Sequence, residues 1–235
     1  MELELRRPYF VILGNWNPAI FQPGWVGEYV FGIAPGQDFT FMLSQQIRQE
    51  VVEQEVLEAK SPTVLYHSQV GISCLSNRLE IYINDLKDET LSLAEQATIR
   101  VLDTLSHTPI GPYGINFQFN DADPEAEISD LIETKENLTH VKPVLSRDFR
   151  TRMSFNDQCD LNFKRVLNDA GLELNFNFHH TPRSIAQLKD EIPGHYKKYY
   201  ELLIESFGEK YELQGIEEIE VGSHDFDSLQ NEEGE

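Results

Sequence analysis

Histidines and one carboxylate in the C-terminal third of the chain are the residues whose types could do chemistry. His179 and His180 end the alternating stretch LELNFNFHH, and Glu191 and His195 follow, four residues apart. Residues at i and i+4 share one face of a helix, so this pair could join a strand histidine in binding a metal ion. Adjacent strand residues face opposite sides, so only one of His179 and His180 can take part unless the strand ends between them.

Two interpretations of this histidine group stay open. As metal ligands, the histidines would make the protein a metal-dependent hydrolase or nuclease. The alternative, which we favour because the chain contains no H-E-x-x-H pattern, is that they cap a helix or pack at the end of a strand.

An aromatic loop near the N-terminus is a second candidate, for binding. The stretch GNWNPAIFQPGWVG places Trp16, Phe21 and Trp25 among prolines and glycines that favour a loop. Tryptophan often marks a recognition surface, because it offers a large apolar area with one polar group. The favoured alternative is that these side chains fill the end of a sheet as part of the core.

Two arginines in the second half are a further candidate for binding. Arg150 and Arg152 are separated by one residue, so they share a face if this stretch is a strand. Together they could bind an acidic partner or a phosphate. The other interpretation is a solvated face that balances nearby carboxylates.

Other motifs that would indicate an enzyme do not occur. The chain has no GxGxxG, Walker A, GxSxG or protein-kinase signature, so we expect no cofactor and a non-catalytic protein. Cys74 and Cys159 lie far apart without a C-x-x-C pair, which predicts free thiols in a reducing compartment. No apolar run is long enough for a membrane helix, and MELELRRPYF does not resemble a secretory signal, so we expect no membrane association and a cytoplasmic location.

The charge restricts the class of partner. Forty acidic and 19 basic residues give a net charge of -21, and the chain after Lys210 contains acidic residues but no Lys or Arg. Such a field repels phosphate backbones, which disfavours direct binding of nucleic acid. We expect a protein partner, for which a basic surface would be complementary, and a homodimer is compatible with the sequence. A further alternative is an acidic mimic of nucleic acid that occupies a basic groove on another protein.

Periodic patterns predict the elements that would position these residues. We expect strands at residues 9–13, 28–33, 64–75, 77–83, 115–119, 150–155 and 172–178, a loop at 107–114, and helices at 45–59 and 91–105. The clearest helix follows Ser184, which forms a capping-box pattern with Gln187, and Pro193 should kink or divide it. The strings INFQF (115–119) and LNFNF (174–178) match position by position, which suggests an internal duplication.

These elements predict an α+β fold of two similar halves, each an antiparallel sheet packed against one or two helices. The halves would span residues 1–122 and 141–211, joined by an acidic connection at 123–140 and followed by an acidic, flexible tail at 212–235.

The elements run in the order RLEIYIND, LSLAEQATIRVLDTLSH and IGPYGINFQF, with LELNFNFHH and an amphipathic helix at the C-terminal end. This layout resembles a sporadically distributed family of uncharacterised bacterial proteins. The resemblance implies a two-part α+β protein whose patchy distribution is typical of accessory or defence-linked genes, and it supplies no catalytic residues. We therefore expect a bacterial, cytoplasmic protein-interaction or accessory protein.

Overall fold

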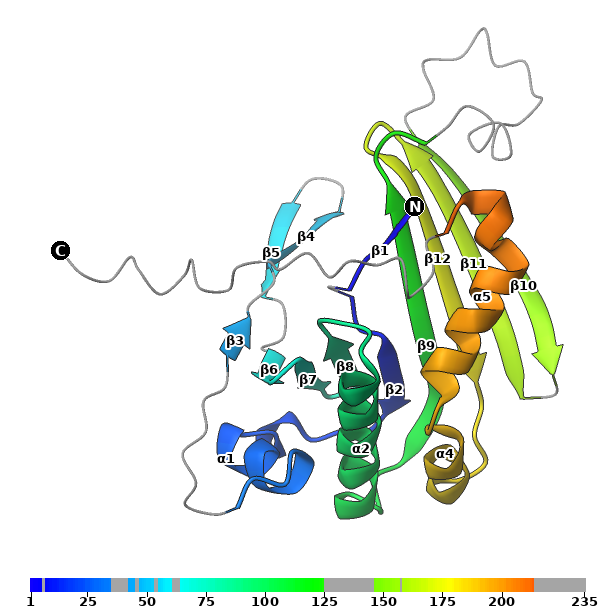
Figure 1. The fold of residues 1–235 in the computed structure, drawn as a ribbon. Helices are drawn as coiled ribbons and strands as arrows, with labels where there is room; N and C mark the ends of the chain where they lie inside the picture. Colours follow the sequence, from blue (N-terminus) through cyan, green and yellow to red (C-terminus); the bar gives the residue numbers. More distant parts are fainter. Residues whose placement is uncertain are drawn as a thin grey trace, which may run out of the picture.

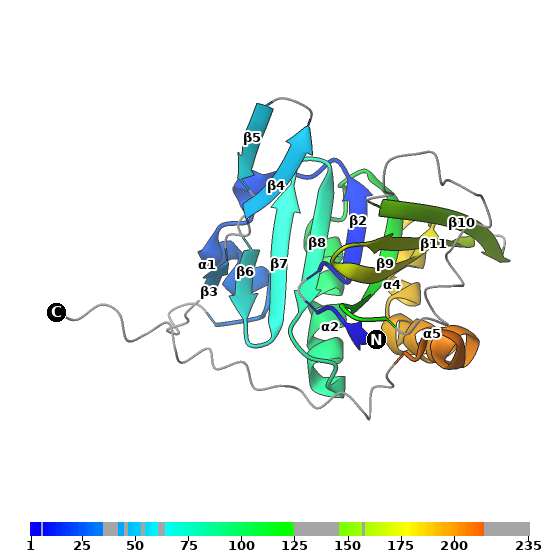
Figure 2. The same ribbon diagram turned by 90° about the horizontal axis from the view of Figure 1, so that it is seen from above.

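A continuous ten-stranded antiparallel sheet forms the centre of the protein (Figure 1). This computed structural model describes residues 1–5, 7–34, 42–44, 47–52, 55–60, 64–124, 146–156 and 158–213. The strands of the sheet are β1 (Glu2–Leu3), β2 (Phe10–Gly14), β3 (Met42–Ser44), β6 (Val64–His67), β7 (Val70–Leu75), β8 (Arg78–Ile83), β9 (Ile110–Asp121), β10 (Ser146–Asn156), β11 (Cys159–Asn168) and β12 (Gly171–His180). Their order is β10-β11-β12-β9-β2-β8-β7-β6-β3, and β1 also pairs with β9. The sheet is strongly twisted, so that β10 and β11 are turned relative to β7 and β8 (Figure 2).

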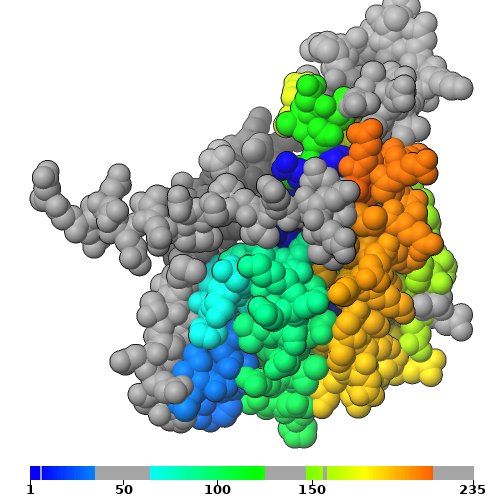
Figure 3. Space-filling model, viewed as in Figure 1, coloured from blue at the N-terminus to red at the C-terminus, as the bar shows by residue number. Residues whose placement is uncertain are grey.

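Helices cover one face of this sheet. They are α2 (Asp88–Thr104), α4 (Ile185–Glu191) and α5 (His195–Tyr211), which lie side by side in Figures 1 and 2 and form the centre and right of the surface in Figure 3. Three short helical turns follow β2 in the chain: η1 (Pro18–Ile20), α1 (Pro23–Trp25) and η2 (Val26–Val30). Of these, η2 contacts α2. No helix among the described residues is long and apolar enough to cross a membrane.

Aromatic side chains fill the core between β9, β12 and α5. Burial alternates residue by residue along β12, as its apolar-polar pattern predicts, with Phe176 and Phe178 buried. The ring of Phe178 stacks on Tyr199 of α5 with 4.2 Å between centroids, and Phe117 of β9 lies 4.7 Å from Tyr196. The helix therefore binds the sheet through large rings that each bury a wide apolar area.

The α+β class predicted from the sequence is confirmed, whereas the expectation of two similar halves is not. Strands from both parts of the chain join one sheet, in which β9 pairs directly with β12. The acidic connection lies outside the described residues beyond Pro124, as does the tail beyond Leu213.

The helix predicted after Ser184 is confirmed, together with its division at Pro193. The Ser184 hydroxyl accepts a hydrogen bond of 3.1 Å from the main-chain N–H of Gln187, and this bond caps α4. Gly194 has a positive φ of 72°, and α5 begins at the next residue. The turn between α4 and α5 thereby brings the end of one helix beside the start of the other.

Three local predictions are wrong. Residues 45–59 do not form a helix but supply β4 (Ile47–Val52) and β5 (Glu55–Lys60), which pair antiparallel. Three valines in this stretch favour strand over helix because they are β-branched. The strand predicted at 28–33 is not formed: residues 28–30 belong to the π-helical turn η2, and residues 31–33 are in no strand.

The loop predicted at 107–114 is also wrong, because β9 already begins at Ile110. The register between β2 and β9 shifts between Ile12 and Gly14, and Pro112 lies opposite this irregularity. A proline is tolerated in a strand where the ladder is interrupted. This early start of β9 brings Tyr113 into the sheet.

Candidate functional site

The end of β12 and the break between α4 and α5 bring three of the predicted site residues together. His180 faces the helices, Glu191 is the last residue of α4 and His195 is the first of α5. The rings of His180 and His195 are 5.7 Å apart between centroids. His179 points to the opposite face of the sheet, so it does not join this histidine cluster.

A tyrosine that the sequence did not single out completes the histidine cluster. Tyr113 of β9 pairs with His180 across the strands, and the two rings stack at 4.5 Å with an interplanar angle of 6°. The Tyr113 hydroxyl donates a hydrogen bond of 2.7 Å to Glu191, whose other oxygen accepts one from Gln187. The carboxylate of Glu191 is therefore held between a strand and its own helix.

Burial sets the protonation of these groups. Desolvation, with His195 as a second cause, lowers the pKa of His180 to about 4, and desolvation also lowers the pKa of His195. The Nε2 atom of His180 and the Nδ1 atom of His195 are buried and have no hydrogen-bond partner in the described part of the chain. Both imidazoles are thus neutral at pH 7. Among the described residues, however, no group of three His, Cys, Asp or Glu side chains is arranged to hold a metal ion.

Cys159 lies at the margin of the histidine cluster. The Tyr199 hydroxyl is 3.9 Å from its sulfur, and the side chain is 2% exposed. Burial raises the pKa of the Cys159 thiol, so the unreactive protonated form dominates at neutral pH. Cys74 is also a free thiol, as the sequence predicted.

The opposite face of the sheet carries a row of hydrogen-bonded asparagines. Asn162 donates to Asn177 at 3.2 Å, Asn177 donates to Asn116 at 2.6 Å, and Asn116 donates to the Pro8 carbonyl at 3.2 Å. These three side chains come from β11, β12 and β9, and we call them the asparagine ladder. All its amides point the same way, so each bond polarises the next.

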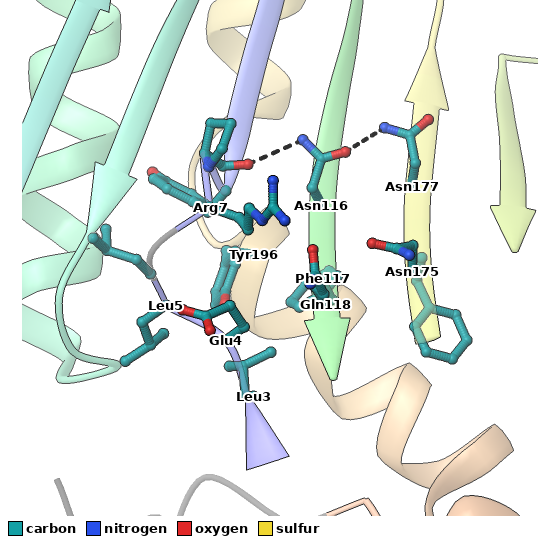
Figure 4. A pocket seen from close by; sticks show the side chains of 14 residues that line it. Leu3, Glu4, Leu5, Arg7, Asn116, Phe117, Gln118, Asn175, Asn177 and Tyr196 are labelled. Atoms are coloured by element: carbon teal, nitrogen blue, oxygen red, sulfur yellow. Dashed lines mark hydrogen bonds between the residues drawn. The ribbon is translucent and has the colours of Figure 1, made fainter. Parts of the chain in front are cut away.

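A cavity of about 220 Å³ lies beside the asparagine ladder, where β1 and β2 leave a gap along β9 (Figure 4). The carboxamides of Gln118 and Asn175 stand at its edge, with Arg7 on the opposite side (Figure 4). Each carboxamide uses one amide hydrogen internally, Gln118 toward Asn120 and Asn175 toward Glu173. Their side-chain carbonyl oxygens accept no hydrogen bond from any described residue.

Arg7 is the cationic group of this cavity. Its side chain is exposed and makes no hydrogen bond or ion pair with the part of the chain that the structure describes. Apolar side chains, including Leu3, Leu5 and Tyr196, line much of the wall, to which Glu4 adds an acidic side chain. The cavity therefore combines an apolar wall with hydrogen-bonding groups, one guanidinium and one carboxylate.

A second hollow, of about 180 Å³, lies on the other side of the asparagine ladder and contains His179. It is bordered by Val11, Leu13 and Gly114, and Leu13 is 41% exposed. At Gly114 an added Cβ atom would overlap the Asn177 amide, so the absence of a side chain makes room for the ladder. Together, the asparagine ladder and the two hollows form what we call the open face.

The aromatic loop divides into a buried and an exposed part. Trp16 is 4% exposed and its indole donates to the Ile12 carbonyl at 3.2 Å, as expected of a core residue. Phe21 lies 5.0 Å from Trp25, which stacks on the exposed Tyr29 at 5.6 Å. The loop thus contributes both to the core and to a small aromatic surface.

Arg150 and Arg152 share one face of β10, as predicted for a strand. Arg150 forms an ion pair with Asp148 at 3.1 Å, and Arg152 forms one with Asp160 on β11. The two arginine side chains remain 76% and 71% exposed. They lie at the edge of the sheet, away from the histidine cluster.

Comparison of the chain with models of protein families, with curated proteins and with solved structures finds no match.

Proposed function

We propose that this chain is a non-catalytic protein-interaction or accessory protein of the bacterial cytoplasm, which binds its partner with the open face. The observation that carries this proposal is the asparagine ladder with a hollow on each side. A defence-linked role, as the family resemblance implies, is part of the same proposal.

The chemistry of the open face suits a polypeptide partner. A carboxamide offers a donor and an acceptor side by side, which matches the N–H and C=O of a peptide main chain. Gln118 and Asn175 keep such groups available, and the hydrogen bonds to Asn120 and Glu173 hold them in place. Groups fixed before binding lose little conformational entropy on association, which favours affinity.

Site-specific photo-crosslinking in the host cell tests this function. A benzoylphenylalanine in place of Gln118 should give a crosslinked adduct that mass spectrometry identifies as one reproducible protein. The matched control is the same residue in place of Glu205, which is exposed on the outer side of α5. Adducts from position 205 alone, or none from position 118, would contradict the proposal.

The histidine cluster supports a second candidate function, a metal-dependent hydrolase. The two buried, unpartnered imidazole nitrogens of His180 and His195 favour it, since neutral imidazole is a good ligand for transition metals. Elemental analysis of natively purified protein should then show stoichiometric metal that His180→Ala removes and His107→Ala retains. Metal-free protein from the host would end this second candidate.

A further inference from the structure

The outer edge of the sheet at β10 is a second surface with the properties of an interface. Among the described strands, β10 is outermost and pairs only with β11 (Figure 2). Its 11 residues span about 36 Å, because a strand rises about 3.3 Å per residue. Such an edge offers a row of main-chain donors and acceptors to another strand.

Side chains on both faces of β10 are available for contact. On the side of the open face, Arg150 is 76% and Asp148 38% exposed. On the helix side, Phe149 and Met153 are partly buried and Phe155 is 44% exposed, so α5 leaves an apolar strip along the edge. The guanidinium of Arg165 lies over the Phe149 ring at 5.6 Å.

We propose that β10 pairs antiparallel with β10 of a second copy of this chain, with the twofold axis at Phe149. In this register Asp148 of each copy lies opposite Arg150 of the other, so two ion pairs form across the interface. With the axis at residue 148, the Asp148 side chains of the two copies would instead lie opposite each other. With the axis at residue 150, the two Arg150 side chains would do so. The charge pattern of β10 thus selects one self-complementary register.

Pairing about this axis has two structural consequences. The Phe149 rings of the two copies meet on the helix side, where apolar cross-strand pairs stabilise a sheet. The two sheets become one, with both open faces on the same side. This inference does not depend on the proposed function, because the edge and the open face use different residues.

Charge exchange at the edge tests the dimer by sedimentation equilibrium on the full chain. The unchanged protein should be dimeric, and D148R and R150D should each raise the dissociation constant on the order of tenfold or more, because each places like charges opposite one another twice. An equimolar mixture of D148R and R150D should restore a dimer, since both arginines of the D148R copy then lie opposite the two aspartates of the R150D copy.

The mixture separates contacts between copies from contacts within one chain. Neither variant keeps the pair that Asp148 and Arg150 make within the chain, so recovery on mixing can come only from complementarity between copies. Arg183→Asp, which changes charge by the same amount at an exposed position outside β10, should leave the dimer intact. A monomeric unchanged protein, dimeric single variants, or a mixture that stays monomeric would each overturn the proposal.

Discussion

Burial of His180 predicts how the stability of the protein depends on pH. In the folded state the pKa of His180 is about 4, below its ordinary value of 6.5, mainly because burial disfavours the charged ring. At pH values between about 4 and 6.5, His180 therefore binds a proton in the unfolded chain but not in the folded chain. The stabilisation is fully present above pH 6.5 and is lost as the pH falls through 4.

The size of this effect follows from the two pKa values. Each pH unit in the window changes the free energy of unfolding by about 1.4 kcal/mol, which gives at most about 3 kcal/mol. We expect roughly 2 kcal/mol, because the measurement ends near pH 4.5, above the folded pKa, and because solvent around the less deeply buried His195 weakens the part of the shift that comes from charge. Neighbouring charged groups shift the pKa of His180 in opposite directions: Glu191 raises it, whereas His179 and Lys198 lower it.

Urea unfolding at a series of pH values from neutral to about 4.5 measures the effect. The comparison is with His180→Phe, which keeps a ring against Tyr113 but cannot take up a proton. The variant should lose less stability than the unchanged protein as the pH falls, whereas the exposed His107→Gln should behave like the unchanged protein. If His180→Phe showed the same loss as the unchanged protein, His180 would not be the buried neutral group that this reasoning requires.

Two further predictions concern the asparagine ladder and the core. Gly114→Ala should be about 1–2 kcal/mol less stable in urea unfolding than Gly111→Ala, because only the first displaces Asn177 from its two hydrogen bonds. Equal stability of the two variants would show that the Asn177 amide moves aside without cost. Leu203→Ala should lose about 2–5 kcal/mol, since Leu203 is fully buried in α5, whereas the exposed Glu205→Ala should change stability by less than about 0.5 kcal/mol. A loss of less than about 1 kcal/mol at position 203 would contradict the packing of α5 on the sheet.

Periodicity and capping predicted the elements that the core depends on. The alternation in β12, the apolar stripe of α2 and the Ser184 cap each reflect local physics that a sequence exposes directly. The helix predicted at 45–59 failed because its apolar residues also fit strands, and pairing between β4 and β5 decides between the two.

The candidate site was less accessible to sequence reasoning, because pairing between strands creates it. Glu191 and His195 were found from their spacing in the sequence. Tyr113 joins them only because β9 pairs with β12 in a register that sets it beside His180, and nothing in the sequence around Tyr113 indicates this. The match between INFQF and LNFNF did carry a signal for the asparagine ladder. Both strings alternate phenylalanine with amides because they are neighbours in one sheet, with a core on one face and the open face on the other.

The position of β9 between β2 and β12 also has a consequence for synthesis of the protein on the ribosome. One edge of β9 can pair with β2 as soon as both strands have emerged from the ribosome. Its other edge stays unpaired until β12 emerges, about 50 residues later. At 5–20 residues per second this interval lasts about 3–10 s, during which INFQF presents an unpaired, phenylalanine-rich edge. A nascent chain stalled at a length at which β9 has emerged from the ribosome but β12 has not should therefore recruit chaperones that bind exposed strands, and release them once residues 171–180 have also emerged.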